Sequence, residues 1–287
     1  MVPGACAPGQ DDPRRSCRFK FRKAFVDDRE VSTATVFPHH VRASQIDLMA
    51  LARFWEWERT VERELPRVID ESDILILFQP IYRLISDVPV ARGFEALSRF
   101  PVAPRIPVGL WFRIAHDLGV SRQLELAAIR AAIDGLQRVS KEAFLCVNAS
   151  LETVSDLVGL VPDGLHDRLM VDVPYSAMRD PRGEELFHLL RDGGAGIAVD
   201  DVPLEDLHVL RSSLLRLRPD CIKVDVLTGL AESAMARFNL AEASAWCQNA
   251  GIRLIAERVE RLSDLAILDE VGVEWAQGYC LSRPVSL

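Results

Sequence analysis

Short apolar runs alternate with longer amphipathic stretches along most of the chain, beginning at residue 74. Runs of this length predict buried strands, whereas apolar residues spaced three and four positions apart predict helices. The pattern predicts eight strands, at residues 74–81, 90–97, 143–150, 168–174, 195–202, 221–225, 253–260 and 275–282. It predicts helices between most of them, at residues 121–139, 183–191, 204–216, 231–249 and 262–271. Gly251 and Gly272 are placed to end the last two helices.

Strands that alternate with helices predict a mostly parallel sheet with helices outside it. Eight strands over about 210 residues fit a closed α/β barrel of the (β/α)8, TIM-like type. An open, doubly wound sheet shows the same alternation of elements, so periodicity alone leaves that alternative open.

The part of the chain before the predicted barrel differs from the rest. Residues 1–43 hold Pro, Gly, Asp and a basic cluster at 14–23 with little periodicity, which predicts a flexible, partly disordered segment. Residues 44–66 have apolar side chains at helical spacing, with Ser44 placed to cap the start. We therefore expect an N-terminal helical segment at 44–72 that packs on a barrel domain at 73–287.

Composition narrows the class of protein. The formal net charge is −8 and the pI is near 5.4, which argues against a partner that is a nucleic acid polymer. Because the chain has no apolar run of the roughly 18–20 residues that a membrane span needs, we expect no membrane span and a cytoplasmic protein. The six cysteines lack metal-ligand spacing, and Cys146, Cys221 and Cys280 are interpreted as buried side chains of strands.

Polar residues fall late in the predicted strands. In a parallel barrel the carboxyl ends of the strands meet on one face, where the loops build the active site. A single acidic residue near the end of a strand is more often a helix cap or an ion-pair partner. Polar residues at the ends of seven predicted strands, however, favour a shared site. Carboxylate and amide oxygens in this number favour Mg²⁺ or Mn²⁺, with two ions as a common arrangement for phosphodiester hydrolysis. The residues are Glu95, Asn148, Asp172, Asp200, Asp201, Lys223, Asp225, Glu257 and Gln277.

Six stretches of the chain, in order, resemble the motifs of EAL domains. They are GFEALSRF (93–100), VNAS (147–150), VDDV (199–202), IKVD (222–225), AERVE (256–260) and QGYCLSRP (277–284). The resemblance covers about residues 74–287 and implies a barrel-fold, cyclic di-GMP-specific phosphodiesterase that forms pGpG with two Mg²⁺ or Mn²⁺ ions. Such an enzyme is a hydrolase that lowers the level of a bacterial second messenger in signal transduction.

The resemblance also implies roles for individual residues. Metal ligands would be Glu95, Asn148, Asp172, Asp200, Asp201 and Glu257. Catalytic residues would be Glu257, Lys223 and Glu95, with Lys223 orienting the attacking water. Substrate-binding residues would be Gln79, Arg99 and Gln277.

Several positions depart from the family pattern. Asp172 stands where the family usually has Glu, and Tyr175 replaces a second Glu that supports a mobile loop. Val202-Pro203 replaces Phe-Gly in that loop, and Arg258 replaces a Gly. Pro fixes the dihedral angle φ and removes a hydrogen-bond donor, so this loop is rebuilt relative to the family.

Three functions are therefore considered. The first is an active cyclic di-GMP phosphodiesterase, and the second is a degenerate EAL domain that serves as a cyclic di-GMP receptor or a protein-interaction regulator. The third is an unrelated barrel enzyme that acts on another phosphodiester or phosphate. The resemblance further implies a homodimer, and regulation is expected through the N-terminal 70 residues, a protein partner or self-association.

Overall fold

The computed structural model describes residues 48–84, 88–157, 159–162, 164–226 and 230–287. The predicted flexible segment, residues 1–43, and the predicted cap Ser44 lie outside these residues. Backbone contacts divide the chain into two compact units, 1–53 and 54–287, and the second holds every strand described.

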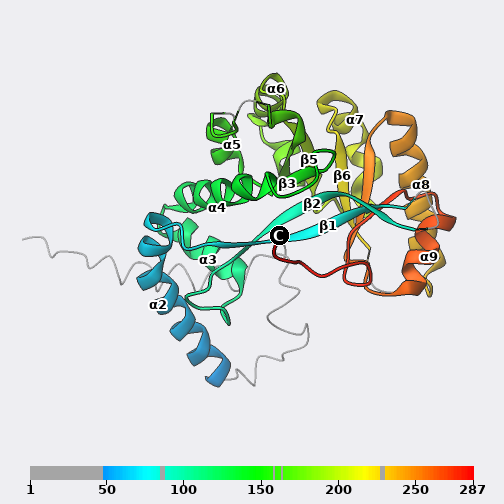
Figure 1. The fold of residues 1–287 in the computed structure, drawn as a ribbon. Helices are drawn as coiled ribbons and strands as arrows, with labels where there is room; N and C mark the ends of the chain where they lie inside the picture. Colours follow the sequence, from blue (N-terminus) through cyan, green and yellow to red (C-terminus); the bar gives the residue numbers. More distant parts are fainter. Residues whose placement is uncertain (1–47, 85–87, 158, 163, 227–229) are drawn as a thin grey trace, which may run out of the picture. The chain divides into compact units, whose positions relative to one another are not determined.

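Eight strands close into a barrel in the order β1 to β8, which confirms the TIM-like prediction over the open sheet (Figure 1). The strands are β1 Leu75–Arg83, β2 Val90–Arg99, β3 Phe144–Asn148, β4 Leu169–Pro174, β5 Gly196–Asp200, β6 Cys221–Asp225, β7 Arg253–Glu257 and β8 Trp275–Ala276. The prediction of a strand over 275–282 is wrong beyond Ala276, because the chain turns there. The turn includes Cys280, which is half-buried and does not lie in a strand.

Strand β1 runs against its two neighbours, whereas all other pairs are parallel. Only residues 84–89 connect β1 to β2. A parallel pair needs a crossover of about a dozen residues or more, so this short connection imposes an antiparallel pair. The resulting register places Gln79 directly opposite Glu95.

The predicted helices are present, with two additional ones. The helices are α2 Leu48–Asp70, α3 Val108–Asp117, α4 Ser121–Leu136, α5 Leu151–Leu157, α6 Gly183–Asp192, α7 Leu207–Leu217, α8 Ala234–Ala250 and α9 Leu262–Glu270. Sequence periodicity missed α3 and α5, and α5 is too short to show it. Helix α2 continues past Pro66 to Asp70, within the helical segment predicted at 44–72. Val61, Leu65 and Val68 of α2 are buried in the same hydrophobic cluster as the strands.

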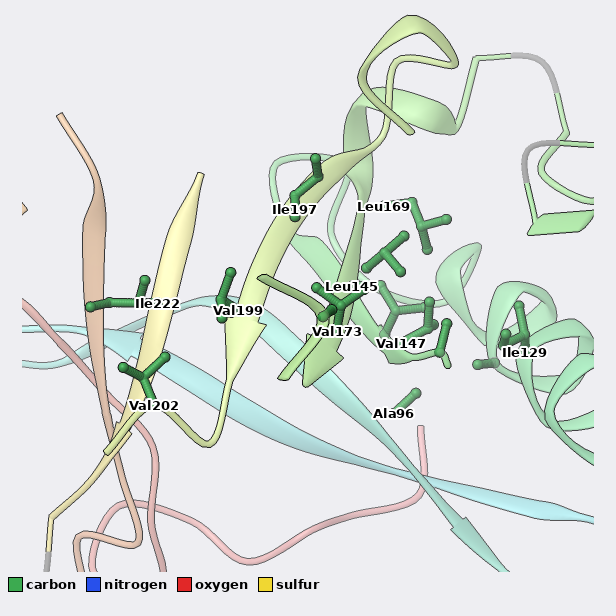
Figure 2. Packing of buried hydrophobic residues seen from close by; sticks show 14 of the residues in the cluster. Ala96, Ile129, Leu145, Val147, Leu169, Val173, Ile197, Val199, Val202 and Ile222 are labelled. Carbon is green, nitrogen blue, oxygen red and sulfur yellow. The ribbon is translucent and has the colours of Figure 1, made fainter. Parts of the chain in front are cut away.

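Side chains alternate between two apolar layers along the strands. One set, which includes Val199 and Ile222, packs with the surrounding helices, and Val202 joins it (Figure 2). The other set forms a smaller cluster of Ile81, Cys146, Met170, Ala198, Cys221 and Ile255. Because side chains alternate with a period of two, this second cluster lines the barrel interior. None of the helices in the described ranges has the length and apolarity that crossing a membrane requires.

Candidate active site at the carboxyl ends of the strands

The candidate residues form the layer directly above the interior apolar cluster. On five parallel strands, a polar residue follows an interior apolar residue by two positions, and therefore points to the same side. The pairs are Cys146 and Asn148, Met170 and Asp172, Ala198 and Asp200, Cys221 and Lys223, and Ile255 and Glu257. Strand alternation therefore places these residues on one face of the barrel, as the sequence predicted.

Lys223 lies at the centre of this layer and has no solvent-exposed side-chain surface. Its Nζ atom is 2.8 Å from Asp172 Oδ2 and 3.0 Å from Glu257 Oε1. The same atom is 3.7 Å from Glu95 Oε2 and 3.9 Å from Asp200 Oδ1. One buried ammonium group therefore joins carboxylates from four strands.

Glu95 is held by two amide side chains from opposite sides. Gln277 donates from Nε2 to Glu95 Oε2 at 2.6 Å, and Asn148 donates from Nδ2 to Glu95 Oε1 at 3.3 Å. Glu95 and Gln277 are both buried. Charge-assisted hydrogen bonds of this kind are stronger than neutral ones, so they set the orientation of the carboxylate.

The loop after β3 is braced from outside the barrel. The carboxylate of Glu125 in α4 accepts hydrogen bonds from the Ser150 backbone N–H at 2.9 Å and from the Ser150 hydroxyl at 2.8 Å. It also accepts one from the Thr153 hydroxyl at 2.7 Å. This network holds the start of α5, which begins three residues after Asn148. Sequence analysis missed Glu125, whose side chain comes from a different helix.

Burial changes the acid strength of these groups. Desolvation raises the pKa of Asp172 to about 7, with Lys223 opposing the shift and Asp200 and Glu95 adding to it. Desolvation also raises the pKa of Glu257 well above its usual value, again against the effect of Lys223. For Lys223, burial lowers the pKa, but the surrounding carboxylates raise it well above the usual range. The lysine therefore stays protonated, while burial and the neighbouring carboxylates favour the neutral forms of Asp172 and Glu257 unless a further cation is bound.

A second basic group lies at the outer part of the site. Arg258 Nε is 2.9 Å from Asp225 Oδ1. Burial raises the pKa of Asp201 and of Asp225, the nearby Asp200 raises both further, and Arg258 lowers both. Asp225 was noted as a late polar residue but not assigned to the site. Its position two residues after Lys223 in the same strand is the signal that identifies it.

The loop after Asp201 is anchored to the core. Val202 is buried, and its backbone N–H donates to the Lys223 carbonyl at 3.0 Å. Pro203 follows with φ of −64°, and the chain then enters a short 3-10 helix at Leu204–Asp206 and helix α7. Tyr175 is half-buried and packs against the core, with Arg179 over its ring. These departures from the family pattern are accommodated by packing.

The structure places Gln79 beside the carboxylate cluster, but it places the Arg99 side chain outside the cluster. Gln79 is buried beside Glu95 and donates from Nε2 to the Ser282 carbonyl at 3.2 Å. Arg99 continues β2 beyond Glu95 and donates to the Ser98 carbonyl at 2.8 Å. Within the described residues, no hydrogen bond or ion pair joins Arg99 to the carboxylates, so the structure does not bring this residue into the cluster.

The donor chemistry of the cluster fits a divalent cation. Among the residues that the structure describes, no three acidic, His or Cys side chains already have the geometry of a metal site, because Lys223 lies between the carboxylates. The carboxylates of Glu95, Asp172, Asp200, Asp201, Asp225 and Glu257 meet only Lys223 and Arg258 as basic groups in the described chain. Asp172 Oδ1, which is buried, makes no hydrogen bond there. Excess negative charge on hard oxygen donors is what Mg²⁺ and Mn²⁺ neutralise.

Gly278 brings two loops of the site together. A Cβ atom at this position would overlap the backbone of Val259, next to Arg258. We expect Gly278→Ala to lower the free energy of unfolding by about 2–3 kcal/mol, because the loops must separate to admit the methyl group. Urea unfolding measures the change. Gly109→Ala is the control, since its Cβ meets no atom within 4 Å. Equal stability of the two variants would contradict this account of the loops.

Comparison with known proteins identifies the family and agrees with the fold. The EAL domain family model matches residues 62–284. A cyclic di-GMP phosphodiesterase, PdeB of Shewanella oneidensis, is 25% identical over 268 residues, which is 80% of this chain. The chain spans only 29% of the length of that relative.

Solved structures share the barrel. The FimX EAL domain of Xanthomonas citri in complex with cyclic di-GMP superposes with a TM-score of 0.70 at 18% identity, covering 82% of this chain and 97% of that domain. BlrP1 of Klebsiella pneumoniae, in complex with calcium and cyclic di-GMP, superposes with a TM-score of 0.62 at 24% identity, covering 74% of this chain and 56% of that protein. Because the family model matches residues 62–284, the chain belongs to the EAL domain family.

Proposed function

We propose that this chain is a phosphodiesterase that hydrolyses cyclic di-GMP to pGpG with water activated by bound Mg²⁺ or Mn²⁺, and so lowers the level of this second messenger. The observation that carries the proposal is the buried Lys223 among four carboxylates at the carboxyl ends of the strands. Family membership and the phosphodiesterase name of the Shewanella relative support it.

The divalent ions would be held by the oxygen atoms of the cluster. The family resemblance implies two ions, and we propose that the ligands at this site are Glu95, Asn148, Asp172, Asp200, Asp201 and Glu257. When bound, such ions lower the pKa of water and stabilise negative charge on a phosphate. The chain itself supplies orientation, since Asn148 and Gln277 fix the Glu95 carboxylate.

The ammonium group of Lys223 supplies a positive charge to the site that does not depend on a bound metal. Its ammonium group is buried, protonated and within 4 Å of Glu95, Asp172, Asp200 and Glu257. It therefore keeps like charges together and offers N–H donors to an attacking water or a phosphate oxygen. We propose that Lys223 orients the attacking water and that Glu257 polarises it. Gln79, Arg99 and Gln277 are proposed to bind substrate, and Arg99 would have to leave the Ser98 carbonyl to do so.

A second function, a cyclic di-GMP receptor that does not hydrolyse its ligand, is favoured by one observation. The short side chain of Asp172 already lies 2.8 Å from Lys223, so this acid has less reach toward a metal than a glutamate. A receptor of this kind would act through a regulatory protein partner or a homodimer, both of which stay predictions.

Incubation of the purified chain with cyclic di-GMP and Mg²⁺ or Mn²⁺ tests the proposal, with chromatography to detect pGpG. Calorimetry of the same mixture with Ca²⁺ measures binding. Metal-dependent release of pGpG supports the phosphodiesterase. Binding without turnover, even at high protein concentration, refutes it and supports the receptor, and absence of both refutes both functions.

A further inference from the structure

Arg258 has an unusual backbone conformation. It follows Glu257 at the end of β7 with φ of +54°, in the left-handed region that favours glycine. A residue with a side chain pays of the order of 1–3 kcal/mol there, and it persists only where the surroundings hold it. Asp201, which follows Asp200 at the end of β5, has the same conformation with φ of +53°.

The side chain of Arg258 has an acidic partner on the neighbouring strand. Its Nε atom lies 2.9 Å from Asp225 Oδ1, and Asp225 is the register partner of Glu257. We name Asp200, Asp201 and Asp225 the outer acidic group, to distinguish them from the acids in direct contact with Lys223 at 2.8–3.0 Å.

The outer acidic group needs a cation, and two kinds are available. A divalent ion is one, and a guanidinium fixed by a carboxylate is the other. Lys223 Nζ is 3.9 Å from Asp200 and has closer partners in Asp172 and Glu257, so it neutralises this group only in part. Arg258 lies on the outer side and half of its side-chain surface is exposed to solvent.

We propose that the Arg258 guanidinium is the resident cation of the outer acidic group and takes the place of one divalent ion there. The proposal rests on the proposed function only in treating this cluster as the site that handles the substrate. A guanidinium stays charged at every accessible pH and donates hydrogen bonds to phosphate oxygens, but it does not activate water. The wild-type site would thus hold one divalent ion fewer than the two that the family resemblance implies.

Counting Mn²⁺ ions tests this directly, without nucleotide. Electron paramagnetic resonance of free Mn²⁺ gives the number bound per chain for the wild type and for Arg258→Gly. We expect the variant to bind one more ion, because it exposes the outer acidic group and glycine accepts the positive φ without cost. Arg218→Gly is a matched control, since Arg218 also has a positive φ, of +49°, but caps α7 three residues before β6 begins, at the opposite end of the strand from Asp225.

Location of the additional ion is tested by Asp225→Asn in the Arg258→Gly background. We expect this double variant to return to the wild-type number of Mn²⁺ ions. Equal numbers in the wild type and Arg258→Gly overturn the proposal, as does an additional ion that persists in the double variant or appears in Arg218→Gly. Since the count needs no turnover, its result is separate from a failure of cyclic di-GMP hydrolysis.

Discussion

Replacing Glu95 by alanine is expected to lower cyclic di-GMP hydrolysis at least about 10³-fold, because metal-assisted charge stabilisation is worth several kcal/mol and each 1.36 kcal/mol is tenfold in rate. Glu95 accepts from both Asn148 and Gln277 and lies 3.7 Å from Lys223. Its loss removes a proposed metal ligand and leaves both amides without their acceptor. The rate of pGpG formation at saturating Mn²⁺ measures the effect.

Two further variants make this result specific. Glu142→Ala removes an exposed carboxylate that pairs with Arg92 on the surface, and should retain the wild-type rate. Glu95→Gln keeps the shape of the side chain, so a loss of rate there reflects the missing charge and not a packing defect. If Glu95→Ala keeps its rate within tenfold of the wild type, Glu95 is not part of the catalytic site.

The second large effect is on stability. Lys223→Met should lower the free energy of unfolding of the metal-free protein by about 3–5 kcal/mol, because removing one partner of a buried ion pair leaves uncompensated charge. Here the lysine has four acidic neighbours and no exposed side-chain surface. Methionine has similar length, so the change is mainly one of charge. Urea unfolding in the presence of a chelator measures the change.

Lys141→Met is the matched control for this change, since Lys141 is exposed. It should leave the urea midpoint nearly unchanged. Added Mn²⁺ should stabilise Lys223→Met more than the wild type, because the carboxylates then depend on the metal for their charge balance. An unchanged midpoint for Lys223→Met would mean that the buried ammonium does not hold the carboxylates together.

Most of the barrel and of the inner part of the site follows from local sequence pattern. Strand alternation with a period of two places Asn148, Asp172, Asp200, Lys223 and Glu257 on the side of the interior cluster, so their convergence needs only the parallel order of the strands. Helices with an apolar stripe, such as α6 and α7, were also predictable, although α3 has such a stripe and was missed. Their apolar faces report burial directly.

Other features depend on contacts that no local pattern contains. The left-handed conformation of Arg258 comes with its ion pair to Asp225, on a different strand. The end of β8 at Ala276 reflects the close approach of Gly278 to Val259, which periodicity does not report. Arg99 has the right sequence spacing for the site, yet its side chain turns to the neighbouring carbonyl of Ser98.

The reversed direction of β1 has a mechanical consequence. Leu75, the first residue of β1, pairs with Arg99, so β1 begins at the end of the barrel where the carboxylates lie. Helix α2 ends at Asp70, five residues before Leu75, and an ion pair of 3.2 Å joins Arg67 of the helix to Asp73 in the connecting segment. A load applied to α2 therefore acts along β1 in shear. Because Gln79 is the register partner of Glu95, such a load acts on the pairing that positions the Glu95 carboxylate.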